Sequence, residues 1–174
     1  MTFVERMIGA ARLDVRAYEE VEADQGATSQ ALAVVVLAAL AAGIGSGLGV
    51  GLGGLLAGAL ASILSWLAWA WLVWFIGTKW LREAQTSTDT GELLRTLGFA
   101  ASPGLLRVLG VVPVLGYLVF TVTTIWMLVT TVVAVRQALD LRSTGRAVVI
   151  CLIGWVLHVV IFFGLLRLLR AGTV

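Results

Sequence analysis

Charged residues, cysteines and long polar loops are scarce in this sequence. Only 13% of its 174 residues are Asp, Glu, Lys or Arg, 60% are hydrophobic, and the mean hydropathy is +1.01. Soluble globular domains carry about 25% charged residues, so the composition excludes that class and indicates a membrane protein. The single cysteine, Cys151, excludes an intrachain disulfide. The polar stretches between the apolar segments are short, which excludes a large soluble domain.

Long apolar stretches occupy most of the chain after residue 29. A bilayer core about 30 Å thick requires about 20 helical residues to cross it. On this scale the sequence predicts five crossing segments, at residues 30–48, 55–77, 92–112, 113–135 and 146–166. We therefore predict an all-α polytopic membrane protein with five transmembrane helices, of which the third is kinked or broken. Residues 1–29 form a cytoplasmic amphipathic segment, and residues 30–170 form the membrane domain.

The amino-terminal segment has the spacing of an amphipathic helix. Its apolar residues recur every three or four positions and share one face, namely Val4, Ile8, Ala11, Val15 and Tyr18. We expect this helix to lie at the membrane surface, where it either packs on the bundle or docks another protein. The segment contains no apolar run typical of a cleavable signal peptide, so we expect it to be retained.

The basic residues are distributed unequally between the two membrane sides. With five crossings, nine Arg and Lys residues lie on the amino-terminal side, and the remaining three are Arg107, Arg167 and Arg170. Positively charged loops stay in the cytoplasm, so we predict a cytoplasmic amino terminus. If the third segment entered the bilayer and returned on the same side, the ratio would again be nine to three. Charge therefore does not distinguish four crossings from five.

The third apolar segment has a break in its middle. Arg95 and Arg107 are only 12 residues apart, about 18 Å along a helix, and Pro103 lies between them. Proline lacks a backbone donor and strains the preceding turn, so the carbonyls near Phe99 and Ala100 should lack helical partners. Such a break is either a kink accommodated by packing or a substrate site of the kind found in transporters.

Glycine recurs at every second position after the first predicted span. On a continuous helix these residues would form two rows for close helix packing, Gly43, Gly47 and Gly51 in one and Gly45, Gly49 and Gly53 in the other. The rows favour either tight packing inside the bundle or self-association of the protein.

Few side chains in the spans suggest chemistry. His158 is the only ionisable residue deep in a strong span, and with Cys151 it supplies at most two metal ligands. A metal site requires more, so we expect a hydrogen-bonded histidine. Arg107 should reach the outer surface and Arg136 the inner one. The spans contain no carboxylate pair and no nucleophile beside an evident base, so we expect a non-enzymatic protein without metal or cofactor.

Several runs in the second half of the chain form a recognisable pattern. They are Gly98-Phe99-Ala100-Ala101-Ser102-Pro103, Val112-Pro113-Val114-Leu115-Gly116, Ile125-Trp126-Met127-Leu128-Val129, Val133-Ala134-Val135-Arg136-Gln137-Ala138-Leu139-Asp140 and Arg146-Ala147. The first resembles the Gly-Tyr-x-x-x-Pro signature in the third membrane segment of the Yip1 family, with Phe99 in place of tyrosine. The chain as a whole is similar to the bacterial and archaeal branch of that family. Gly98, Phe99 and Pro103 then form the family-motif kink.

The resemblance implies a five-helix integral membrane protein with its amino terminus in the cytosol and its carboxyl terminus outside. Eukaryotic members are linked to vesicle trafficking and prenylated GTPases, but their Asp-Leu-Tyr-Gly-Pro signature has no counterpart here, so GTPase binding is not implied. Arginine outnumbers lysine eleven to one, which is typical of a GC-rich prokaryotic genome. We therefore expect the cell inner or plasma membrane.

Two functions are consistent with these features. We expect a membrane scaffold or organiser that acts through helix–helix, lipid or protein contacts. The alternative is a small channel or transporter with a path at the broken third helix. The candidate polar residues are Ser102, Arg107, Trp126, Arg136 and His158. The expected partners are the lipid bilayer, further copies of the chain, and an unidentified membrane or cytoplasmic protein, with no nucleic acid.

Overall fold

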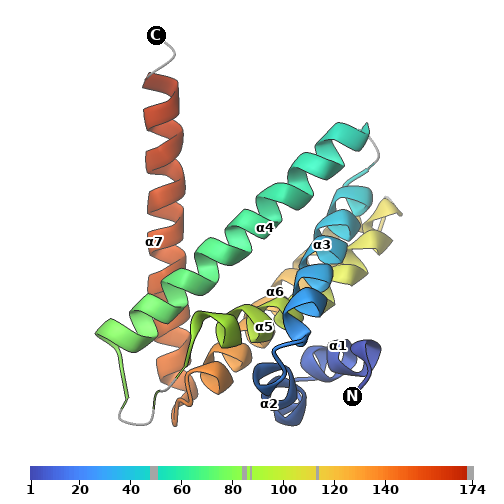
Figure 1. Cartoon of the computed structure of the whole chain (residues 1–174). Coiled ribbons are helices and arrows are strands. Elements are labelled where there is room, and N and C mark those ends of the chain that lie inside the picture. The colour runs from blue at the N-terminus through green and yellow to red at the C-terminus, as the bar shows by residue number, and fades with distance from the viewer. Residues whose placement is uncertain (48–50, 84–85, 87, 113, 172–174) are drawn as a thin grey trace.

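A computed structural model describes residues 1–47, 51–83, 86, 88–112 and 114–171, with side chains described up to Ile161. Every regular element in these ranges is helical (Figure 1), so the predicted all-helical class is confirmed. The elements are α1 (Phe3–Ala11), α2 (Val15–Ala23), α3 (Ala27–Gly45), α4 (Gly51–Phe75), the π-helix η2 (Ile76–Trp80), α5 (Thr90–Ala100), the 3₁₀ helix η3 (Ser102–Val111), α6 (Gly116–Ala138) and α7 (Thr144–Ala171).

Four helical stretches are long and apolar enough to cross a membrane. They are α3, α4 together with η2, α6, and the part of α7 from Thr144 to Ile161. Each corresponds to a predicted span, with ends displaced by a few residues. The remaining predicted span, residues 92–112, falls on α5 and η3, which are two short helices of different period.

The α5–η3 segment lies alongside α3 and runs in the same direction. Three pairs of small residues meet along the contact, and we call them the small-residue seam: Ala31 with Gly98, Ala38 with Gly104, and Gly45 with Gly110. A β-carbon added to any of these three α5–η3 glycines would lie 2.6 to 3.1 Å from an α3 atom. Successive pairs are seven residues apart on α3 and six residues apart on α5–η3. Seven residues of α-helix and six residues of mostly 3₁₀ helix both rise about 11 Å and make about two turns. The pairs therefore stay in register.

The glycine run after α3 is not one helix. Helix α3 ends at Gly45, and α4 begins at Gly51. Gly47 has a φ of +100° and Gly51 a φ of +59°, backbone conformations that glycine adopts without steric cost. Gly49 lies outside the described residues. The two rows that these glycines would form on one continuous helix are therefore divided between the separate helices α3 and α4.

The glycines of those rows differ in their packing. A β-carbon at Gly45 would lie 1.8 Å from the carbonyl oxygen of Arg107, whereas one at Gly43 would meet only the end of the Leu55 side chain. At Gly53 nothing lies within 4 Å. Gly45 thus makes a close intramolecular backbone contact.

The amino-terminal segment forms two helices rather than one. Thr2 and Glu5 form a capping box that begins α1, and the Asp14 side chain caps α2. Between the helices, Leu13 has a φ of +64°. We call α1, this turn and α2 the amino-terminal hairpin.

The hairpin buries a different face from the predicted one. Its buried residues are Arg6, Ala10, Ala17, Tyr18 and Val21. Val4, Ile8 and Val15 are exposed, Ala11 is half-buried and Tyr18 is buried, so these five residues do not share one face as predicted. The cause is the turn after α1, which changes the helical register between the two halves.

The core lies at the end of the bundle that carries the hairpin. Its largest fully buried side chains include Tyr18, Phe99, Ile76, Leu93, Leu139 and Ile150. The amino-terminal half of α4 instead exposes a row of leucines at residues 52, 56, 60 and 64. Such a row suits contact with lipid.

Candidate functional site

An open groove lies between α3, α4 and α7. It encloses about 1190 Å³ and is lined mainly by apolar and small side chains. Helix α4 contributes Gly54, Gly58 and Ser62, which recur every four residues and therefore share one helical face. Figure 1 shows that α4 and α7 lie close together near η2 and diverge toward their other ends. The groove therefore opens between helices that have the length and hydropathy of membrane spans.

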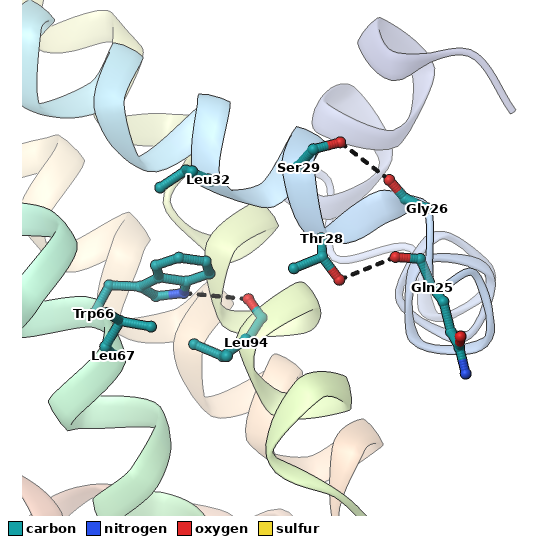
Figure 2. Close-up of a pocket in the computed structure, with 8 residues that line it drawn as sticks. All are labelled: Gln25, Gly26, Thr28, Ser29, Leu32, Trp66, Leu67 and Leu94. Carbon is teal, nitrogen blue, oxygen red and sulfur yellow. Dashed lines mark hydrogen bonds between the residues drawn. The ribbon is translucent and has the colours of Figure 1, made fainter.

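A smaller pocket of about 470 Å³ lies at the hairpin end of α3 (Figure 2). The Trp66 indole lines both this pocket and the groove, and its Nε1 donates a hydrogen bond to the Leu94 carbonyl at 3.2 Å. The hydroxyls of Thr28 and Ser29 donate to carbonyls of their own chain three residues earlier. The polar side chains that Figure 2 draws are thus largely engaged locally, and this pocket offers few groups to a ligand.

Arg107 supplies a positive charge beside the groove. Its Nε donates to Thr123 Oγ1 at 3.2 Å and its Nη2 to Thr124 Oγ1 at 2.9 Å, both on α6. The guanidinium carbon also lies 5.4 Å from the centre of the Phe120 ring, within cation–π range. The side chain therefore joins η3 to α6 rather than extending freely.

No carboxylate pairs with Arg107 in the part of the chain that the structure describes. The reason lies in the sequence, because all ten acidic residues occur at positions 5–24, 83–92 and 140. These positions belong to the hairpin and to the ends of α4, α5 and α6 near it. The charge of Arg107 thus has no counter-ion within the described protein.

His158 lies on the opposite wall of the groove. Its Nε2 is 3.4 Å from the Ser65 hydroxyl, and its ring meets Trp69 edge to face with centroids 6.1 Å apart. The structure thus gives His158 the hydrogen bond that we predicted. Among the described residues, no group of three or more His, Cys, Asp or Glu side chains is placed to hold a metal ion.

At the break in the third segment, hydroxyl groups donate hydrogen bonds to two backbone carbonyls. Ser102 Oγ donates to the Phe99 carbonyl at 2.6 Å, and Thr130 Oγ1 donates to the Ala100 carbonyl at 2.7 Å. These are the carbonyls that the proline was predicted to leave without helical partners. Phe99 and Ala100 are 0% and 1% exposed, so neither carbonyl faces an open path.

The hairpin is fixed to the bundle by buried donors and backbone carbonyls. Trp126 Nε1 donates to the Ala11 carbonyl at 2.8 Å, and the Tyr18 hydroxyl lies 3.0 Å from the Ala10 carbonyl and 3.3 Å from that of Thr130. The Phe99 ring of the family-motif kink meets Phe3 edge to face. The hairpin is therefore an integral part of the bundle.

Arg95 makes a further connection that the sequence did not reveal. Arg95 is 6% exposed, and its guanidinium donates to the carbonyls of Val21 and Glu22 at the end of α2. The only sequence signal was an arginine inside an apolar segment. Arg136, predicted at the inner surface, donates through Nε to the Leu141 carbonyl in the turn after α6.

The carboxylates of the hairpin differ in their electrostatics. Burial raises the pKa of Glu22 to about 7, with Asp140 and Glu92 adding to the rise and Arg95 opposing it. In contrast, a hydrogen bond from Arg6 lowers the pKa of Asp24. The Glu22 carboxylate therefore changes charge near neutral pH.

Comparison with curated proteins and with solved structures gives no match. A family model described as the Yip1 domain matches residues 15–166, which include α2, the four candidate membrane spans among the described residues and the run Gly98–Pro103. Because this match covers most of the chain, the protein belongs to the Yip1 family of membrane proteins.

Proposed function

We propose that this protein is a non-enzymatic membrane scaffold and that the groove between α3, α4 and α7 is its binding surface. The groove carries the proposal, because about 1190 Å³ of mainly apolar space lies open between bilayer-length helices. A face of this kind accepts an acyl chain or a helix of similar hydropathy. The transport alternative has less support. The carbonyls at the break in the third segment, which would line a transport path, already accept hydrogen bonds from hydroxyl groups.

We further propose five crossings, with the amino terminus in the cytoplasm and the carboxyl terminus outside the inner or plasma membrane. The small-residue seam supports this topology. It takes the α5–η3 segment along α3 from Ala31 to Gly45, about 21 Å of helix. The excess of basic residues on the amino-terminal side supports the orientation.

The scaffold proposal is tested by filling the groove with Gly58→Leu. A β-carbon at Gly58 meets nothing within 4 Å, and Gly58 lines the groove, so the added side chain starts from open groove space. Gly53→Leu is the matched control, because Gly53 is equally open but does not line the groove. The readout is native mass spectrometry of protein extracted from its own membrane into lipid nanodiscs.

We expect the wild type to retain further subunits, a partner protein or specific lipids. Gly58→Leu should lose them, and Gly53→Leu should keep them. A wild-type monomer that retains no partner and no specific lipid would contradict the scaffold proposal, and retention of a small polar solute would favour transport instead.

A further inference from the structure

We propose that the groove holds an anionic phospholipid whose phosphate pairs with Arg107. This assignment rests on the scaffold proposal, because it names the occupant of the same groove. Arg107 lines the groove and has no carboxylate partner among the described residues. Arg107 is half-buried beside mainly apolar side chains, where a charge without a counter-ion is costly, so an anion from outside the chain would stabilise it.

The guanidinium retains donors for that anion. Two of its five N–H groups bind Thr123 and Thr124. Three N–H groups therefore remain, and a planar guanidinium matches the oxygens of a phosphate in a two-pronged hydrogen bond. The threonines and the Phe120 ring hold the group in place beforehand, which reduces the entropy lost on binding.

The groove accommodates the rest of a lipid. Its α4 wall runs from Gly54 to Leu72, about 27 Å along the helix. Small residues on this wall leave space for an acyl chain, and leucines and tryptophans beside them supply apolar contact. The groove thus offers one positive charge and a long apolar surface. These match the phosphate and the acyl chain of a phospholipid.

A second copy of the chain fits the charge less well than a lipid does. Two copies inserted in the same direction bring the same ends together. The acids all lie toward the hairpin end, so the copy would offer Arg107 further arginines and no carboxylate. Like charges at close range repel. An anionic lipid supplies the missing charge directly.

The test uses vesicles that contain equal amounts of phosphatidylglycerol and phosphatidylcholine. The protein is extracted from them into nanodiscs, and the lipids that remain bound are counted by native mass spectrometry. We expect the wild type to enrich phosphatidylglycerol and Arg107→Gln to lose that enrichment by about tenfold or more, the loss typical of a charged hydrogen-bonded contact. Arg107→Lys should keep part of it. Arg142→Gln, which removes an exposed arginine in the turn before α7, should behave as the wild type.

Thr124→Val separates charge from packing, because it removes one contact of Arg107 but leaves the guanidinium. It should retain most of the enrichment. Thermal unfolding of each variant shows whether it is folded. Unchanged selectivity in Arg107→Gln, or an equal loss in Thr124→Val, would overturn the lipid assignment. If Gly58→Leu still lost its partners in that case, the scaffold proposal would stand without the lipid.

Discussion

Among the glycines that the structure describes, Gly45 has the closest approach to a neighbouring backbone. An added β-carbon would lie 1.8 Å from the Arg107 carbonyl oxygen, which belongs to the backbone of η3. A backbone atom cannot move aside as the end of a flexible side chain does. Substitution at this position must therefore separate η3 from α3.

We predict that Gly45→Ala lowers the free energy of unfolding by about 1–3 kcal/mol or more, the usual cost of overpacking. Gly53→Ala, on the neighbouring helix, should raise it by up to about 1 kcal/mol, because alanine favours a helix over glycine and nothing lies within 4 Å. Thermal unfolding in detergent micelles measures both. Equal effects of the two variants would contradict the close contact.

At the residue scale, the sequence predicted effects between neighbouring residues but not contacts between distant ones. Pro103 indicated that carbonyls just before it would lack helical partners, since that effect acts within one turn. The sequence did not reveal that Thr130 would donate to the Ala100 carbonyl, because the two residues are 30 positions apart and meet only through packing. Arg95 was missed for the same reason.

At the scale of the elements, the attachment of the amino-terminal hairpin depends on charge. Glu22 lies at the end of α2 near Asp140, Glu92 and Glu19, with Arg95 as the opposing charge. Its pKa is raised from 4.5 to about 7. Between these values the folded protein binds a proton that the unfolded chain does not. The stability that this proton adds to the folded state is therefore complete below pH 4.5 and is lost as the pH rises through about 7.

We predict that the hairpin opens more readily at about pH 8 than at about pH 5.5. The rate of limited proteolysis within α2 measures the opening. Glu22→Gln should remove most of the difference, since the amide stays neutral. Glu5, Asp14, Glu20 and Asp24 have lowered pKa values, so their effects appear only at more acidic pH. A pH response that survives Glu22→Gln would assign the effect to another group.

Hydropathy predicted the long helices well, because each must satisfy its own backbone in lipid and so needs a continuous apolar stretch. It predicted the hairpin poorly. The turn at Leu13 depends on a single left-handed residue, and without it the apolar spacing reads as one helix. Alternating glycines fit both a helix and a turn, so the sequence did not specify where α3 ends and α4 begins.

Taken as a whole, the molecule confines its acidic residues to one end. All ten acids lie toward the hairpin end, and Arg107 lies toward the other end with Arg167 and Arg170 beyond it in the sequence. Charge counting alone left four or five crossings open. The small-residue seam supports five, but it depends on which glycines meet which alanines, and composition does not specify that pairing.

Single cysteines in a Cys151→Ala background distinguish the two topologies. With five crossings, Val112→Cys should react with an impermeant maleimide added outside the cell, and Ser143→Cys should react only after permeabilisation. Both positions are exposed. A third segment that returned on the cytoplasmic side would reverse the two results, because α6 would then cross in the opposite direction.

The unequal spacing of the seam has a mechanical consequence. Positions seven apart on α3 meet positions six apart on α5–η3, so the three contacts coincide at only one axial offset. Sliding by a turn would bring larger side chains against the alanines, and the pair therefore behaves as one rigid body. The row at Gly54, Gly58 and Ser62 on α4 lines the groove instead. Any change of shape on binding should therefore appear as tilting of α4 and α7 against a fixed frame.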